Sequence, residues 1–278
     1  MEAAVVWRVW RRILRESAVR DVVFGGRLDE RAGVLGLDAA EVEVARAYAE
    51  HPAGARMFVH SYRFRMVSSF FNALETVAPL THRALLANEV DLRAVAHDLL
   101  DRREWADSGP YVYSFGREIL DHIAADTSLG RIDGLTELVA LEGAAADVVV
   151  SAAGADPKDA REEPAGSLRL RLPCRAHTGH RDLSEWLRDP AALGRTSPAV
   201  RIRHYVIFLP SLDDARRIVA VPHRAADMVR ILARYPVDLP HLAAELARRG
   251  HPAAPEQDQR TLARLVRMGL VAAPGGQN

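Results

Sequence analysis

The hydrophobic periodicity of the chain changes once, near its middle, and this change limits the architectures that the chain can adopt. Upstream of residue 154 apolar residues recur at helical spacing, whereas downstream of residue 166 they alternate as in strands. The segment GADPKDAREEPAG, 154–166, combines glycine, proline and mixed charge with no large apolar residue, which is typical of a linker. We therefore expect a helical domain over residues 1–153, a linker over 154–166 and a second domain over 167–278.

The first half of the chain predicts a series of helices. One of them begins with Asp38 as N-cap and carries Glu41 three residues later, which is a capping-box pattern. The next ends before Pro79 and has an apolar stripe at helical spacing, made of Phe58, Tyr62, Met66, Phe70 and Leu74. Further helices are expected in EVDLRAVAHDLLDRR, SFGREILDHIAAD and GLTELVALEGAAADVVVSA. The opening segment sets Trp7 and Trp10 between arginines; a membrane-surface helix has this pattern too, but we favour a helix packed on its own domain.

The second half predicts a small sheet followed by helices. Alternating apolar residues indicate strands in SLRLRLP, VRIRHYVIFLP and RRIVAVP, the second of which becomes continuously apolar, as a buried strand does. Helices are expected in HRAADMVRILARY, in DLPHLAAELARRG with Gly250 as its stop, and in PEQDQRTLARLVRMGLV with Pro255 in its first turn. The fold class is therefore mainly α with a C-terminal α+β module of three strands and three helices, similar to a winged helix.

Composition and charge indicate in which compartment the protein resides and what kind of partner it binds. The only cysteine, Cys174, cannot form an internal disulfide, which fits a reducing cytosol. No apolar run approaches the length of a membrane span and the N-terminus lacks the pattern of a signal peptide, so we expect a cytoplasmic protein. The net charge is zero, but residues 1–150 hold 17 basic against 23 acidic residues and residues 201–278 hold 12 against 7. The C-terminal segment is thus the part that would attract an acidic peptide or nucleic acid.

The strongest candidate for a metal site in the sequence is Cys174, His177 and His180, at three-residue intervals. Structural zinc sites need four ligands, usually as two separated pairs, and no second pair containing cysteine exists. Pro173 and Gly179 favour a polar loop at this place. The motifs HExxH, GxSxG, GxGxxG and the P-loop are absent from the chain. We therefore expect no metal, no cofactor and no catalytic residue in this protein.

A basic module of this kind would bind DNA through a helix-turn-helix or a peptide through an open sheet edge. A helix-turn-helix needs a turn of about three or four residues, and GHPAAPEQ between the last two helices is about twice as long. Arg260, Arg264 and Arg267 share one helix face, which beside the strand RRIVAVP would make a basic groove for an extended acidic or amphipathic peptide. A solvated helix face has the same pattern, so both interpretations stay open.

Two parts of the chain resemble known proteins. DLPHLAAELARRG and LARLVRMGLV resemble the last two helices of the precursor-peptide recognition elements found in systems that modify ribosomally made peptides (RiPPs). YRFRMVSSFFNALETVAP, YSFGREIL and LVALEGA are similar to the helical domain of the partner proteins of multinuclear iron-dependent oxidative enzymes. The combination resembles the methanobactin-type and thiaglutamate-type accessory proteins and covers most of the chain.

The resemblance implies a non-catalytic accessory subunit that binds the leader of a precursor peptide and delivers it to an oxidative enzyme, which modifies it, often at cysteine. It implies that the iron and its ligands belong to that partner enzyme, a barrel-shaped subunit. The leader would add as a strand along RRIVAVP. The residues expected to contact it are Arg216, Arg217, Val219, Val221, Arg260, Arg264 and Arg267. The enzyme would bind the helical half, in part through Tyr62, Arg63 and Arg65.

A competing hypothesis is a winged-helix transcriptional regulator with a helical effector domain. An acidic helical half and a basic winged half fit that class as well as the accessory subunit. An enzyme of unknown type is the third possibility.

Overall fold

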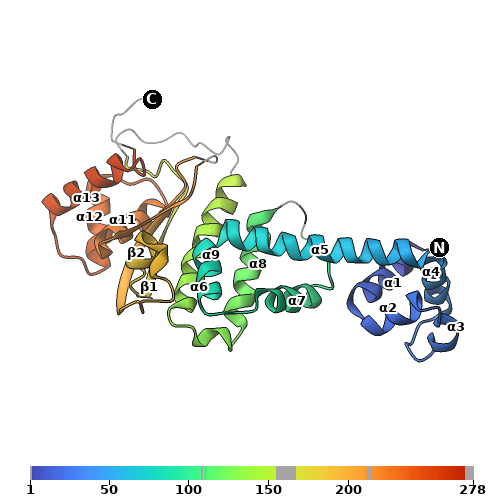
Figure 1. Cartoon of the computed structure of the whole chain (residues 1–278). Coiled ribbons are helices and arrows are strands. Elements are labelled where there is room, and N and C mark those ends of the chain that lie inside the picture. The colour runs from blue at the N-terminus through green and yellow to red at the C-terminus, as the bar shows by residue number, and fades with distance from the viewer. Residues whose placement is uncertain (1, 108, 110, 155–166, 212–213, 273–278) are drawn as a thin grey trace. The chain divides into compact units, whose positions relative to one another are not determined.

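The computed structural model of the chain describes residues 2–107, 109, 111–154, 167–211 and 214–272 (Figure 1). The fold is mainly helical, with a three-stranded antiparallel sheet toward the C-terminus. Two compact units make up the chain: Met1–Ala73 with Asp91–Tyr111, and Leu74–Val90 with Val112–Asn278. The division thus differs from the predicted domain boundary, because helices that we assigned to the first domain belong to the second unit. Of the predicted linker 154–166, only Gly154 lies within the described residues.

The first unit is built of helices alone within its described residues. They are α1 (Ala3–Arg15), α2 (Ser17–Phe24), α3 (Leu28–Arg31), α4 (Ala39–Glu50), most of α5 (Pro52–Val77) and α7 (Leu92–Arg102). The predicted capping box at the start of α4 is confirmed: Glu41 N donates to Asp38 Oδ1 at 2.8 Å, and Asp38 N donates to Glu41 Oε2 at 3.1 Å. Helix α1 buries Trp10 and Ile13 in its own unit, as the favoured interpretation of its pattern requires. No helix of the described chain has the length and apolar character needed to cross a membrane.

The second unit begins with a helical part that contains the end of α5. Its elements are α6 (Pro79–Ala87), α8 (Val112–Ala125), the 3-10 turn η1 (Leu129–Arg131) and α9 (Leu135–Ala153). Glu142 of α9 is 1% exposed and accepts the backbone N–H groups of Leu80 and Thr81 at the start of α6, at 3.1 and 2.7 Å. It thereby satisfies two of the amide groups that a helix N-terminus leaves without partners.

The sheet follows in the same unit. Its strands are β1 (Cys174–Arg181), β2 (Val200–Phe208) and β3 (Arg217–Val221), in the order β1-β2-β3 and antiparallel, with α10 (Ser184–Arg188) and the 3-10 turn η3 (Pro190–Ala192) between the first two. The predicted strands VRIRHYVIFLP and RRIVAVP are confirmed as β2 and β3. Residues Tyr205 to Phe208 of β2 are buried, as their continuous apolar run predicted.

The prediction for the first strand was wrong. SLRLRLP forms only two isolated bridges, from Leu168 to Val237 and from Leu170 to Val271. It therefore pairs with the segments that precede and follow the last two described helices and does not join the sheet. The first strand is Cys174–Arg181, which we had predicted to be a loop. Its side chains are mostly polar and it contains a glycine, so it has a weak strand pattern. The backbone pairs with β2 all the same, because neighbouring strands supply hydrogen bonds that do not depend on side-chain type.

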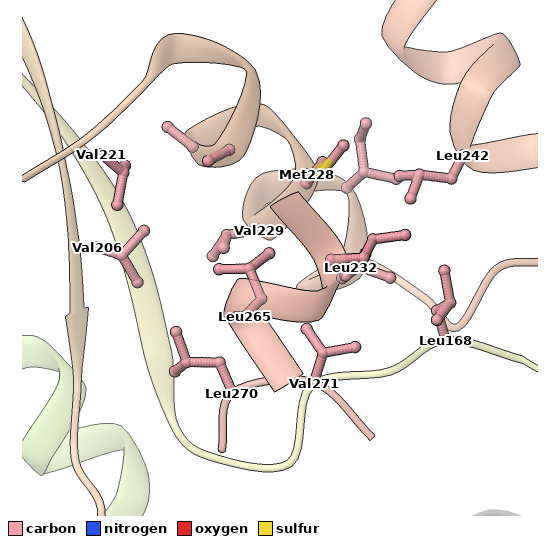
Figure 2. Packing of buried hydrophobic residues seen from close by; sticks show 14 of the residues in the cluster. Leu168, Val206, Val221, Met228, Val229, Leu232, Leu242, Leu265, Leu270 and Val271 are labelled. Carbon is pink, nitrogen blue, oxygen red and sulfur yellow. The ribbon is translucent and has the colours of Figure 1, made fainter. Parts of the chain in front are cut away.

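Three helices end the described chain: α11 (His223–Leu232), α12 (Leu239–Arg248) and α13 (Pro255–Arg267). They lie on one side of the sheet and α9 lies on the other (Figure 1). Apolar side chains of the three helices and of β2 and β3 form one core, in which Val206 and Val221 of the sheet face Val229 and Leu265 of the helices (Figure 2). Tyr205 and Ile207, at 0% exposure, occupy the opposite face of β2. Both faces of the small sheet are therefore covered.

Candidate functional site

β3 is an edge strand. It pairs with β2 on one side, and no other strand of the described chain pairs with it on the other. Its side chains alternate: Val219 and Val221 point to the core formed with α11 to α13, and Ile218 and Ala220 point to the other face. Val219 is half-buried and Val221 is 6% exposed. The predicted row of Val219 and Val221 thus exists, with Val221 as its buried end.

The two arginines beside this strand differ in their availability. Arg217 is exposed at the start of β3. The side chain of Arg216 is only 12% exposed; its guanidinium donates to the carbonyl of Val77 and lies 4.0 Å from Glu142. Arg216 was predicted to contact a peptide, but here it anchors the start of β3 to the helical part of the unit, and we leave it out of the proposed peptide surface.

Arg260, Arg264 and Arg267 lie together on the exposed face of α13, as their spacing predicted. No ion pair or hydrogen bond of their guanidinium groups is found within the described part of the chain. The buried face of the same helix carries Leu262 and Leu265, which belong to the same core as Val221. The helix that bears the three arginines is therefore packed into the module that contains the β3 edge.

The residues predicted to bind a partner enzyme lie on α5 in the first unit, and two of the three are engaged internally. The Tyr62 hydroxyl donates to the carbonyl of Trp105 at 3.0 Å. The Arg63 guanidinium donates to the carbonyl of Leu14 and stacks 3.7 Å from the centre of the Trp105 ring, and burial lowers its pKa. Arg65 is exposed and lies 3.6 Å from Asp107. Only Arg65 of this set offers most of its side chain to a partner.

Helix α5 presents large apolar side chains that were not among the residues predicted to bind the enzyme; one of them, Phe58, belongs to the predicted apolar stripe but is exposed. Met57 is 73% exposed and Phe64 67% exposed, and Phe58 is 60% exposed. Met57 and Phe64 are seven residues apart, so they lie on one face two turns from each other. Isolated exposed apolar residues are common, but three large ones within eight positions of one helix form a candidate contact surface.

Cys174, His177 and His180 do not converge. All three lie on β1, where residues three positions apart point to opposite faces of the sheet. Burial raises the pKa of the Cys174 thiol to about 12, so the sulfur is a protonated, unreactive thiol at neutral pH. Burial lowers the pKa of His177. Because the strand geometry separates these three residues, they cannot bind one metal ion together.

A different cluster of histidines, which the sequence did not suggest, lies at the end of β3. His223 and Asp227 come from the first and second turns of α11, and His251 follows α12. The Nε2 atoms of the two histidines lie 3.3 and 2.9 Å from Asp227 Oδ2. The ring of His204 from β2 stacks on that of His223, with centroids 4.5 Å apart. Only the spacing of His223 and Asp227 on a predicted helix gave a sequence signal, since His251 is 24 residues beyond Asp227.

Asp227 is the electrostatic centre of this cluster. It is 4% exposed, and burial opposes its ionisation. Hydrogen bonds from His251 and Arg230 and the positive charges of His223 and Arg230 outweigh burial, so its pKa lies below the usual value. Burial, with the charges of His223 and Arg230, lowers the pKa of His204. The cluster therefore combines an ionised carboxylate with imidazoles at hydrogen-bond distance.

No protein-family model matches this sequence, and no curated protein matches it. Function is therefore inferred from the residues and their arrangement.

Proposed function

We propose that this protein is a non-catalytic accessory subunit that binds the leader of a ribosomally made precursor peptide and presents it to a multinuclear iron-dependent oxidative enzyme. The observation that carries the proposal is the outer edge of β3, with which no further strand of the described chain pairs, in a module whose helix α13 bears three exposed arginines without ionic partners among the described residues. The three strands and the three helices that follow them resemble the elements of a winged-helix recognition element, although α10 and η3 stand between β1 and β2. The iron would reside in the partner enzyme. The lone, half-buried Cys174 fits a cytoplasmic location.

The leader would bind by strand addition at β3. An extended peptide pairs its backbone with the outer N–H and C=O groups of the strand, and these bonds give affinity without dependence on sequence. Alternate side chains of the peptide would then meet the half-buried Val219 on one face, with Arg217 extending the same row. Selectivity would come from this row and from the charge of α13.

Exposed arginines on α13 would favour acidic leader positions. Arg260, Arg264 and Arg267 stand at spacings of four and three and therefore present one face of positive charge. Exposed ion pairs contribute little individually, but a set of like charges steers an oppositely charged peptide and raises its association rate.

The double substitution Arg260→Glu/Arg264→Glu is expected to weaken leader binding by roughly 1–3 kcal/mol, because attraction becomes repulsion. Fluorescence anisotropy with a labelled leader peptide of a candidate precursor measures the change. Arg131→Glu/Arg234→Glu is the matched control: it alters the net charge equally at exposed arginines elsewhere in the second unit, and leader affinity should be retained.

Two results would contradict this assignment. Equal losses in both double variants would mean that net charge alone, and not the α13 face, governs binding. If the parent protein bound a specific DNA duplex and the α13 variant lost that binding while retaining the leader, the protein would be a winged-helix regulator instead.

The partner enzyme would bind the first unit through α5. The exposed Met57 and Phe64, with Arg65 beside them, form the apolar centre and charged edge that stable interfaces share. Tyr62 and Arg63 would act from behind this surface, because their polar atoms hold α5 to the segment around Trp105.

Met57→Glu/Phe64→Glu should lower affinity for the enzyme at least about thirtyfold, as loss of central apolar contacts costs roughly 2 kcal/mol or more. Co-expression followed by size-exclusion chromatography and a binding titration measures it. Val34→Glu is the control, since Val34 is 75% exposed in the same unit but lies off α5. If the Met57→Glu/Phe64→Glu variant bound the enzyme as well as the parent protein, this surface of α5 would not be the enzyme-binding surface.

A further inference from the structure

Three donor atoms converge at the junction of β3, α11 and the segment after α12. His223 Nε2 and His251 Nε2 lie 3.3 and 2.9 Å from Asp227 Oδ2, and one ligand atom of each of the three residues lies within 4.8 Å of the other two. In a tetrahedral site with bonds of about 2.0–2.2 Å, ligand atoms are about 3.3–3.6 Å apart. Small side-chain rotations would therefore give all three atoms bonding distance to one ion.

The backbone that carries these donors is fixed by independent contacts. His223 and Asp227 are four residues apart on α11 and so share a face. His251 N donates to the carbonyl of Leu246 at 3.0 Å, after Gly250 has turned the chain with a φ of +85°. Just beyond, Arg224 Nη1 donates to the carbonyl of Pro252 at 2.8 Å. The donors are thus presented by a helix and by a tied segment, not by a free loop.

The carboxylate is oriented toward the histidines by two arginines. Asp227 Oδ1 accepts from Arg230 Nη1 at 2.7 Å and from Arg249 Nη1 at 3.3 Å, which leaves Oδ2 directed at the two imidazoles. Metal-binding carboxylates commonly have such a hydrogen bond on the oxygen that does not face the metal, because it fixes their orientation.

The same arginines set a limit on affinity. Arg230 and Arg249 place two positive charges beside one carboxylate, and they oppose a cation. The imidazole donors must carry the binding, which selects a borderline transition metal over calcium or magnesium, since these prefer oxygen ligands.

We propose that His223, Asp227 and His251 bind one divalent transition-metal ion, with zinc as the ion that this donor set and a tetrahedral geometry fit best. Three protein ligands leave a fourth position for water or another ligand. The ion would connect α11 to the segment that leads into α13 and would stabilise the three-helix core. This departs from our expectation of no metal, which was argued from Cys174, His177 and His180 and from the absence of motifs such as HExxH.

Titration of the full chain with zinc chloride, after removal of metal by a chelator, tests the proposal by calorimetry at neutral pH. Cobalt(II) chloride is the spectroscopic probe, because its visible absorption reports the coordination geometry. We expect one equivalent to bind and the thermal unfolding temperature to rise. His223→Ala and His251→Ala should each weaken binding by roughly 100-fold or more, since loss of even a hydrogen-bond partner of a metal ligand costs about 10–100-fold. His241→Ala is the matched control: His241 of α12 lies 2.7 Å from the N-cap residue Asp238, and this histidine–carboxylate pair has no third donor among the described residues.

Binding of one equivalent that both variants lose and His241→Ala retains would support the site. His223 is exposed, with 56% of its side chain accessible, so its replacement tests ligation without disturbing the core. If no stoichiometric zinc or cobalt binds, or if binding survives His223→Ala, the proposal is overturned, and the histidines act only as hydrogen-bond partners of Asp227. The peptide-binding function stands or falls separately, because it is measured with the leader.

Discussion

Replacing Arg224 with alanine should lower the free energy of unfolding of the second unit by about 3–5 kcal/mol, the usual cost of leaving one partner of a buried ion pair alone. The Arg224 and Asp258 side chains are 8% and 12% exposed, and Arg224 Nη2 donates to Asp258 Oδ2 at 2.8 Å. The pair connects α11 to α13. Amide hydrogen exchange along these two helices, with urea denaturation, measures the loss.

Two further variants make this prediction decisive. Arg224→Leu/Asp258→Leu should recover much of the stability, since replacement of a whole buried pair by apolar residues removes the stranded charge. Arg248→Ala, at a pair with Glu245 in which the arginine is 68% exposed, should change stability by about 1 kcal/mol at most. If Arg224→Ala cost no more than Arg248→Ala, the pair would not hold α11 to α13.

Trp105→Ala should destabilise the first unit by about 3–5 kcal/mol, as for other large buried side chains. The indole is 1% exposed, and its Nε1 donates to Asp101 Oδ1 at 2.6 Å. Arg63 covers one ring face, and the His97 ring is nearly perpendicular to the indole, with ring centroids 5.6 Å apart. Hydrogen exchange in α5 and α7 is the measurement of choice, because it separates the two units.

Trp7→Ala is the control for this substitution. Trp7 is 58% exposed on α1, so its removal should change stability by about 0.5 kcal/mol or less. Similar effects of the two substitutions would show that the packing around Trp105 contributes little. A selective loss at Trp105 should also weaken enzyme binding indirectly, since Tyr62 and Arg63 would lose their anchor.

Elements with a local chemical signature could be predicted from the sequence. The Asp38–Glu41 capping box, the N-cap at Asp238 and Pro255 in the first turn of α13 lie where their residue types require them. Such features depend on residues three or four positions apart, so the sequence contains all the information that decides them.

Features that depend on distant partners could not be predicted. β1 is a strand because β2 is available to pair with it, although its own residues have a weak strand pattern. The His223, Asp227 and His251 cluster needs the fold to return the chain to α11 after α12. The burial of Arg216 depends likewise on Glu142, far away in the sequence, so the arginine resembled a surface charge until the fold was known.

The candidate peptide surface was predicted in part for the same reason. Spacing alone placed Arg260 and Arg264 on one face of a helix, and alternation alone placed Val219 and Val221 in one row. The exposure of Met57 and Phe64 was not predictable, because an apolar stripe at helical spacing has the same appearance whether it is covered or exposed.

Helix α9 covers one face of the sheet, and this affects how parts of the protein could be transferred into another protein. A C-terminal fragment that begins at residue 167 would lack α9, and the face of β2 that holds Tyr205 and Ile207 would then be exposed to water. Arg216 would also lose its hydrogen bond to the carbonyl of Val77 and its ion pair with Glu142. Transplanting the proposed leader specificity into another protein would therefore require grafting α6, α8 and α9 along with the strands, and a chimera joined within the predicted linker would be prone to aggregate.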